Sequence, residues 1–163
     1  MTAMNDPNEY DALDALITRL DDTPLLSETE EAELYRRRQI FLRAATIRLF
    51  EHSETYGQAT GDLAIYNQSE ETYRAEIRDT DSDLNVQIAR FNFGLDRWFE
   101  YGECHPPYFP WRIAIILSKR RELAREKCFL ASYCRHFGDR KGNRDEMIVA
   151  RAKKKGAFKS FNC

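Results

Sequence analysis

The segment Asp83–Pro110, DLNVQIARFNFGLDRWFEYGECHPPYFP, decides the fold. Its first part places large apolar side chains at steps of four and three residues, which is the spacing of one face of an α-helix. These side chains are Leu84, Ile88, Phe91, Leu95, Trp98 and Phe99. Gly102 offers a place for this helix to end, and the three prolines from Pro106 to Pro110 cannot continue it. The segment therefore predicts a core-facing helix over 83–101, followed by a sharp break.

The N-terminal half reads as helices joined by a polar stretch. Apolar residues recur at helical spacing between 13 and 20, which predicts a short amphipathic helix. Ser27, followed three residues later by Glu30, is the signature of a capping box, so a second helix should begin there. The stretch 52–82 is the least legible part of the chain, and the glycines near its start mark a loop.

The C-terminal half also reads as helical. One long helix is predicted over 111–137 and ends at Gly138, and a last helix is predicted over 144–155. Strand-like alternation is nearly absent from the chain. We therefore predict an all-α fold, a compact helical domain of five to six helices that forms a single domain over 1–163.

The net charge of −2 conceals a polarity along the chain. The acidic head, residues 1–35, holds ten Asp or Glu and one Arg. The basic end begins at 119, and residues 119–159 alone hold fourteen Lys or Arg against five acids. Such a distribution is typical of a protein that contacts nucleic acid at one end only, and a solvated helix surface is the alternative.

The composition indicates a soluble cytoplasmic protein with no membrane partner. Charged residues make up 32% of the chain, and no apolar run approaches the roughly 18 residues of a membrane span. The N-terminus lacks the basic start and apolar stretch of a secretion signal. The four cysteines lack the close spacing of a disulfide framework, so we expect them to be reduced.

Sequence motifs for catalysis are absent. The chain has no Gly-rich phosphate loop, no Gly-x-Ser-x-Gly and no His-Glu-x-x-His, and its three histidines are scattered. A zinc site built on Cys128, Cys134 and His136, with Cys104 and His105 in support, is an alternative, but the ligands are not closely paired. Buried small cysteines account for the pattern better. We expect no enzymatic activity, no cofactor and no metal.

Residues 21–38, DDTPLLSETEEAELYRRR, combine a Pro-Leu-Leu start, a Ser cap, a Glu-rich turn and a basic end. This segment resembles the first conserved segment of housekeeping-type bacterial sigma factors. The matching residues are Pro24, Leu25, Leu26, Ser27, Glu30, Glu31, Leu34 and Arg37. If the resemblance to sigma factors is set aside, the same residues predict a well-capped helix.

A second segment resembles the clamp-binding helix of the same family, in which Asn-x-Gly-Leu-x-Arg precedes an aromatic pair and a tryptophan-bearing helix. Asn92, Gly94, Leu95 and Arg97 occur here in that order. The resemblance implies that the helix at 83–101 docks on the coiled-coil clamp helices of the largest subunit of RNA polymerase. Because the apolar stripe should point inward, we expect Asn92 and Arg97 to lie nearer the rim.

The stretch after the prolines has the composition of a surface for melted promoter DNA. Unstacked bases stack on aromatic rings while basic side chains hold the phosphates, at roughly 1–3 kcal/mol per base. The alternative is that the aromatic rings fill a core. The predicted nucleic-acid contacts are Tyr108, Phe109, Trp111, Arg112, Lys119, Arg120 and Arg121.

The chain departs from the sigma-factor pattern in three ways. No helix is evident before the clamp-binding segment, Trp111 stands where the family has a tryptophan pair, and nothing later resembles the upstream-element domains. A rival placement lays residues 121–162 on the core helices of the same family, and it implies polymerase binding without strand contacts.

The functional expectation is a sigma-like transcription regulator, phage-borne or phage-derived, that binds RNA polymerase and promoter DNA. A separate DNA-binding co-activator would select the promoter. A polymerase-riding antitermination factor is a close variant. A helical protein-interaction adaptor without nucleic-acid contact is the alternative from a different class.

Overall fold

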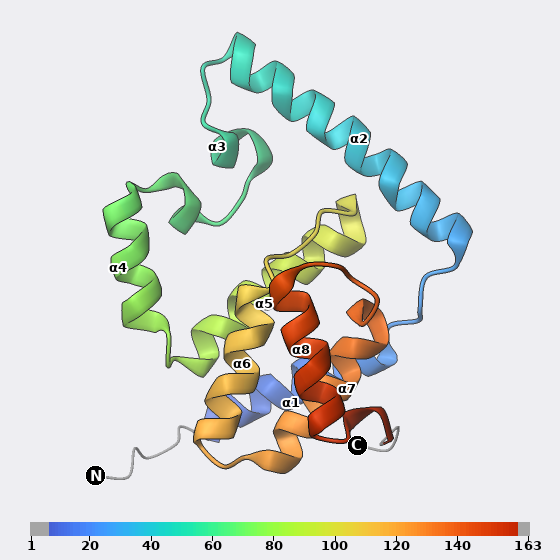
Figure 1. Cartoon of the computed structure of the whole chain (residues 1–163). Helices are drawn as coiled ribbons and strands as arrows, with labels where there is room; N and C mark the ends of the chain where they lie inside the picture. The colour runs from blue at the N-terminus through green and yellow to red at the C-terminus, as the bar shows by residue number, and fades with distance from the viewer. Residues whose placement is uncertain (1–6, 160–163) are drawn as a thin grey trace. The chain divides into compact units, whose positions relative to one another are not determined.

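The computed structural model describes residues 7–159, and every regular element in this range is a helix (Figure 1). The all-α prediction is confirmed, but the described range holds eight α-helices rather than five or six. They are α1 (Pro7–Asp22), α2 (Glu28–Glu51), α3 (Tyr56–Thr60), α4 (Glu70–Thr80), α5 (Leu84–Tyr101), α6 (Tyr108–Lys119), α7 (Leu123–Phe137) and α8 (Asn143–Lys154). Two short 3-10 helices, η1 (Ala64–Asn67) and η2 (Ala157–Lys159), accompany them.

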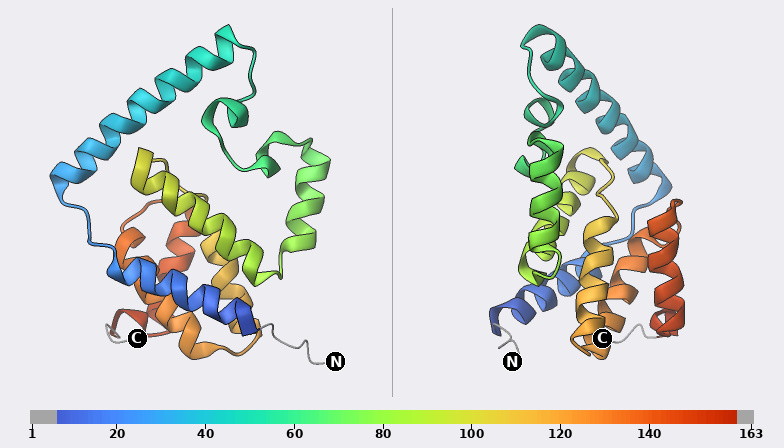
Figure 2. Two further views of the ribbon diagram at one scale, coloured as in Figure 1. Left: turned by 180° about the vertical axis from the view of Figure 1, so that it is seen from behind. Right: turned by 60° about the vertical axis from the view of Figure 1, so that its left-hand side comes forward.

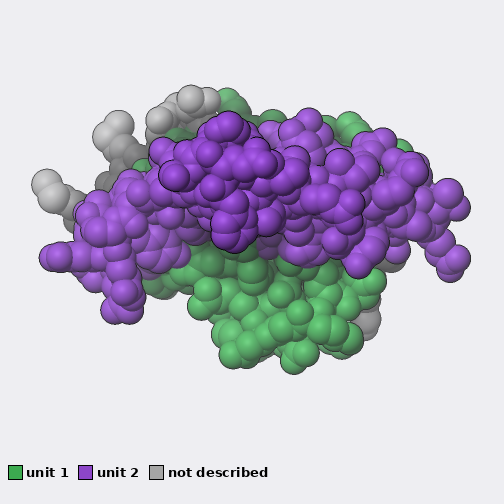
Figure 3. Space-filling view, turned by 90° about the horizontal axis from the view of Figure 1, so that it is seen from above, with its two compact units in different colours: residues 1–25, 82–92, 106–163 green, residues 26–81, 93–105 purple. Residues whose placement is uncertain are grey.

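The chain divides into two compact units, which Figure 3 colours separately. Unit 1 comprises residues 1–25, 82–92 and 106–163, and unit 2 comprises residues 26–81 and 93–105. The helix predicted over 83–101 is α5, which contributes its first half to unit 1 and its second half to unit 2.

Between residues 7 and 159, no helix combines the length and the apolar character that crossing a membrane requires.

Unit 1 is organised around α7, which packs against α1, α6 and α8 (Figure 2). Four aromatic rings form the centre of its core, and their neighbouring centroids lie 5.2–6.2 Å apart in tilted or edge-on arrangements. These geometries are favourable for aromatic pairs. The rings belong to Phe91 of α5 and to Phe129, Tyr133 and Phe137 of α7.

The prediction of one long helix over 111–137 is wrong, because the chain turns between α6 and α7. Arg121 adopts a left-handed backbone conformation with φ of 63°. The turn lets α7 pack back on α6, whose buried side chains lie along one side of the helix. The helix also begins earlier than predicted, at Tyr108, because Pro110 lies in the first turn, where proline is tolerated.

In unit 2, helix α5 ends at Gly102, as the sequence predicted. Gly102 has a φ of +70°, which L side chains rarely adopt. A Cβ atom at this position would also lie 2.7 Å from the carbonyl oxygen of Leu34 on α2. Glycine is therefore required here both by the backbone conformation and by the close approach of α2.

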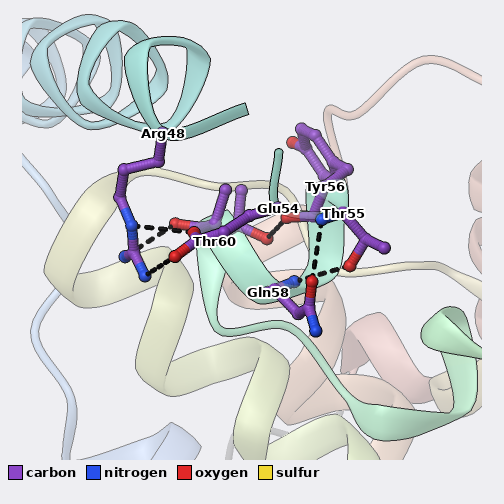
Figure 4. Close-up of polar contacts among 7 residues, drawn as sticks. Arg48, Glu54, Thr55, Tyr56, Gln58 and Thr60 are labelled. Carbon is purple, nitrogen blue, oxygen red and sulfur yellow. Dashed lines mark hydrogen bonds and ion pairs between the residues drawn. The ribbon is translucent and has the colours of Figure 1, made fainter. Parts of the chain in front are cut away.

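The loop predicted at the start of 52–82 contains a helix, α3, which Figure 4 shows with its polar contacts. The N–H of Gln58 donates to Oγ1 of Thr55 at 3.2 Å, and the N–H of Thr55 donates to Oε1 of Gln58 at 2.9 Å. Arg48 of α2 joins this turn by donating to the carbonyl oxygen of Ala59 at 3.3 Å and to Oε1 of Glu54 at 3.0 Å. The Thr-x-x-Gln spacing is itself a capping-box signature, so this helix was legible in the sequence.

The capping box predicted at the start of α2 is confirmed. The N–H of Glu30 donates to Oγ of Ser27 at 3.3 Å, and the N–H of Ser27 donates to Oε2 of Glu30 at 2.8 Å.

Ser27→Ala should therefore lower the free energy of unfolding of unit 2 by about 1 kcal/mol, because the first turn of α2 loses its side-chain acceptor. Urea unfolding followed by far-UV circular dichroism measures the change. Gln39→Ala, on an exposed position of the same helix, is the matched control. An unfolding midpoint equal to that of the parent would show that the capping box contributes nothing.

Candidate nucleic-acid interface

The outward face of α6 carries aromatic and basic side chains and no acid. Tyr108, Trp111, Arg112, Ile115 and Lys119 fall at positions i, i+3, i+4, i+7 and i+11, so they share one side of the helix. Lys119 is exposed and the other four are half-buried. The helix contains no Asp or Glu at all, so no carboxylate of α6 lowers the positive charge of this face.

Helix α8 places arginines over the rings of α6. The guanidinium carbon of Arg144 lies 5.1 Å from the ring centroid of Tyr108, and that of Arg151 lies 5.9 Å from the ring of Trp111. Both distances fall within the range of cation–π attraction. We call the combined area the α6–α8 surface, and it consists of Tyr108, Trp111, Arg112, Lys119, Arg144 and Arg151.

Buried ionic contacts hold Arg151 in place. Its Nε donates to Oε1 of Glu126 at 2.6 Å, and Nζ of Lys155 lies 3.1 Å from the other carboxylate oxygen. Glu126 belongs to α7 and is fully buried. The three residues form a cluster between α7 and α8 that fixes the arginine beside Trp111, so the α6–α8 surface is positioned by the core of unit 1.

The seven predicted nucleic-acid residues separate into two groups. Phe109 is 1% exposed beneath the guanidinium of Arg90, so it is a core residue and its prediction as a base contact is wrong. Arg120 donates to Oε2 of Glu9 at 2.7 Å and is tied to α1. The remaining residues lie at or near the surface: Tyr108, Trp111, Arg112, Lys119 and Arg121.

The predicted polymerase-binding residues lie mostly inside the protein. Leu95 is fully buried, and Gly94 is packed so closely that a Cβ would lie 2.6 Å from Cβ of His105. Asn92 is half-buried and accepts a hydrogen bond from Nη1 of Arg19 at 2.9 Å.

The prediction that Arg97 lies at a rim is wrong. Its side chain is part of the interior of unit 2, where it pairs with Glu103 and donates through Nη1 to the carbonyl oxygen of Thr60 at 2.7 Å. Three aromatic rings surround its guanidinium at 5.4–6.0 Å. They belong to Phe41, Phe93 and Tyr101. A partner could not reach this arginine while unit 2 is folded.

Arg144 and Arg151 are the members of the α6–α8 surface that sequence reasoning missed. They lie seven residues apart on one side of α8, and that spacing was visible. Their pairing with the rings of α6 was not visible, because it depends on how two helices that α7 separates along the chain pack together.

Cys104 and Cys134 are free thiols, which agrees with the prediction for these two. Cys163 lies outside the described residues. Burial raises the pKa of the Cys134 thiol to about 11, which makes it a poor nucleophile at neutral pH.

Within residues 7–159, no group of three or more His, Cys, Asp or Glu side chains is arranged to hold a metal ion.

No protein-family model, curated protein or solved structure matches the chain.

Proposed function

We propose that this protein is a sigma-like transcription regulator that contacts opened promoter DNA through the α6–α8 surface and acts together with RNA polymerase. The observation that carries this proposal is the acid-free face of α6 flanked by the arginines of α8. Half-exposed aromatic rings and cations alternate on it, with Arg144 over Tyr108 and Arg151 over Trp111.

The chemistry of this surface suits single-stranded nucleic acid. Unstacked bases stack on aromatic rings and on the planes of arginine guanidinium groups. An arginine lying over a ring can therefore extend a stack from ring to guanidinium to base. Lys119 and Arg121 are exposed at the C-terminal end of α6 and would attract the phosphates.

RNA polymerase is the protein partner that the sigma-factor resemblance implies, and a separate DNA-binding co-activator would supply promoter choice. Of the two segments that carry the resemblance, the one around Ser27 forms a capped and accessible helix start. The burial of Leu95 and Arg97 argues that docking uses other residues than the predicted ones. An antitermination factor, which binds RNA polymerase during elongation, would use the same contacts.

Tyr108→Ala and Trp111→Ala should each weaken binding of a fluorescent single-stranded oligonucleotide by roughly 1–3 kcal/mol, because each removes a stacking face. Arg144→Ala should weaken binding to all sequences and reduce the slope of log K against log salt by about 0.7 per lost phosphate contact. Fluorescence anisotropy over a salt series measures both quantities. Arg74→Ala, an exposed arginine on α4, is the control.

The alternative, an adaptor without nucleic-acid contact, predicts a different outcome. The oligonucleotide would then bind weakly, and the four variants would not differ from the parent. Exposed apolar side chains on α2 favour a protein-binding role of this kind. A pull-down of the tagged protein from its host adds a second test, because the absence of polymerase subunits at low and moderate salt would contradict the proposed function.

A further inference from the structure

Helix α2 exposes large apolar side chains on the side that unit 2 does not use. Ile40, Ile47 and Phe50 are 64%, 48% and 83% exposed, whereas Leu34 and Ala45 are buried on the other side of the same helix. Single exposed apolar residues are ordinary on protein surfaces. Three of them along one side of a helix mark a face that a partner can cover.

The exposed residues follow the spacing of a coiled-coil seam. Arg36, Ile40, Arg43, Ile47 and Phe50 are separated by four, three, four and three residues, which keeps them on one line along a helix. We call these five residues the α2 seam. It spans two heptads, or about 21 Å at 1.5 Å per residue. The two arginines occupy equivalent positions seven residues apart, and so do the two isoleucines.

The arginines are available to a partner. Arg43 is exposed, and its guanidinium has no ion-pair partner in residues 7–159. Arg36 donates through Nε to Oε2 of Glu33 at 3.0 Å, in an exposed pair within the helix. Exposed pairs of this kind contribute little, so Arg36 can exchange its partner at small cost.

A second copy of this chain fits the α2 seam poorly. In a parallel pair, Arg36 and Arg43 would each face their own equivalents, and like charges at the seam are repulsive. The antiparallel registers that align most of the seam set an arginine of one copy against an isoleucine of the other, for example Arg36 against Ile47 and Ile40 against Arg43. Either arrangement desolvates a guanidinium without a counter-charge.

We propose that the α2 seam docks an amphipathic helix of a partner protein whose own seam is apolar, with carboxylate side chains opposite Arg36 and Arg43. Leucine or isoleucine on the partner would cover Ile40, Ile47 and Phe50. The carboxylates would form bidentate pairs with the arginines and fix the register. This inference concerns unit 2 alone and does not depend on the α6–α8 surface.

Two synthetic helical peptides of about three heptads test the proposal with the full-length protein. One carries leucines at the seam with glutamates opposite the two arginines, and the other replaces those glutamates with lysines. The glutamate peptide should bind at least about tenfold more tightly in isothermal titration calorimetry. Arg43→Glu should abolish the preference, because either peptide then makes one attractive and one repulsive pair, and the double variant Arg36→Glu with Arg43→Glu should reverse it towards the lysine peptide. Arg74→Glu, on exposed α4, should leave the preference unchanged.

Three outcomes would overturn the proposal. The first is equal binding of both peptides, or no binding of either at about 1 mM. The second is an Arg43→Glu variant that keeps the parent preference while its circular dichroism spectrum is unaltered. The third is a dimer of the parent in sedimentation velocity that Ile47→Asp abolishes, because the seam would then be occupied by a second copy.

Discussion

Replacing Glu126 with alanine should destabilise unit 1 by about 3–5 kcal/mol, because it leaves two cations without their buried counter-charge. The carboxylate is fully buried on α7 and receives Arg151 and Lys155 from the C-terminal part of the chain. Removing it deprives both cations of their partner at the contact between α7 and α8. The loss should therefore exceed that of an ordinary surface substitution, which stays within about 0.5 kcal/mol.

The measurement needs a probe that reports on unit 1. The chain has two tryptophans, so a Trp98→Phe background leaves Trp111 of α6 as the single tryptophan. Urea unfolding followed by its emission gives the free energy of unfolding. Glu146→Ala, an exposed acid on α8, is the control. An unfolding free energy for Glu126→Ala equal to that of the control would show that the cluster does not stabilise the fold.

A milder variant separates stability from the surface. Glu126→Gln keeps the side-chain size and one acceptor oxygen but removes the charge that holds Arg151. If the arginine is positioned by that charge, this variant should lose affinity for the single-stranded oligonucleotide while it remains folded. Unchanged affinity in a folded Glu126→Gln variant would mean that Arg151 reaches its place beside Trp111 without the cluster.

The parts of the fold that depend on neighbouring residues could be predicted from the sequence. The stripe from Leu84 to Leu95, the capping box at Ser27 and the helix end at Gly102 are each set by spacing or by backbone preference within a few residues. Helix α3 was predictable in the same way, from the capping-box spacing of Thr55 and Gln58, although that stretch was predicted to be a loop.

The parts that depend on distant packing could not be predicted. No glycine or proline marks the turn at Arg121, which exists because α6 needs α7 folded against it. The sequence also cannot show that Arg144 and Arg151 lie over rings of α6, since local patterns do not fix which helices meet. The candidate surface was therefore predicted in part: its four residues on α6 were named from the sequence, and its two α8 arginines were not.

Arg97→Ala should destabilise unit 2 by about 3–5 kcal/mol, which is the largest effect expected in that unit. Arg97 is 8% exposed, and its side chain connects three elements: it pairs with Glu103 after α5, donates to the carbonyl oxygen of Thr60 at 2.7 Å, and lies 5.4 Å from the ring of Phe41. Removing it leaves Glu103 without its counter-charge and the carbonyl without its donor, and both losses carry a desolvation cost.

Arg97→Lys separates the roles of charge and shape. A lysine keeps the positive charge but cannot donate to Glu103 and Thr60 at once with the planar fork of a guanidinium, nor stack on several rings. It should therefore recover only part of the stability lost in Arg97→Ala. Trp98 emission in a Trp111→Phe background reports on unit 2, and Arg78→Ala on exposed α4 is the control. If Arg97→Ala unfolds like the control and instead loses a binding partner, the arginine is an interface residue and its buried contacts do not hold unit 2 together.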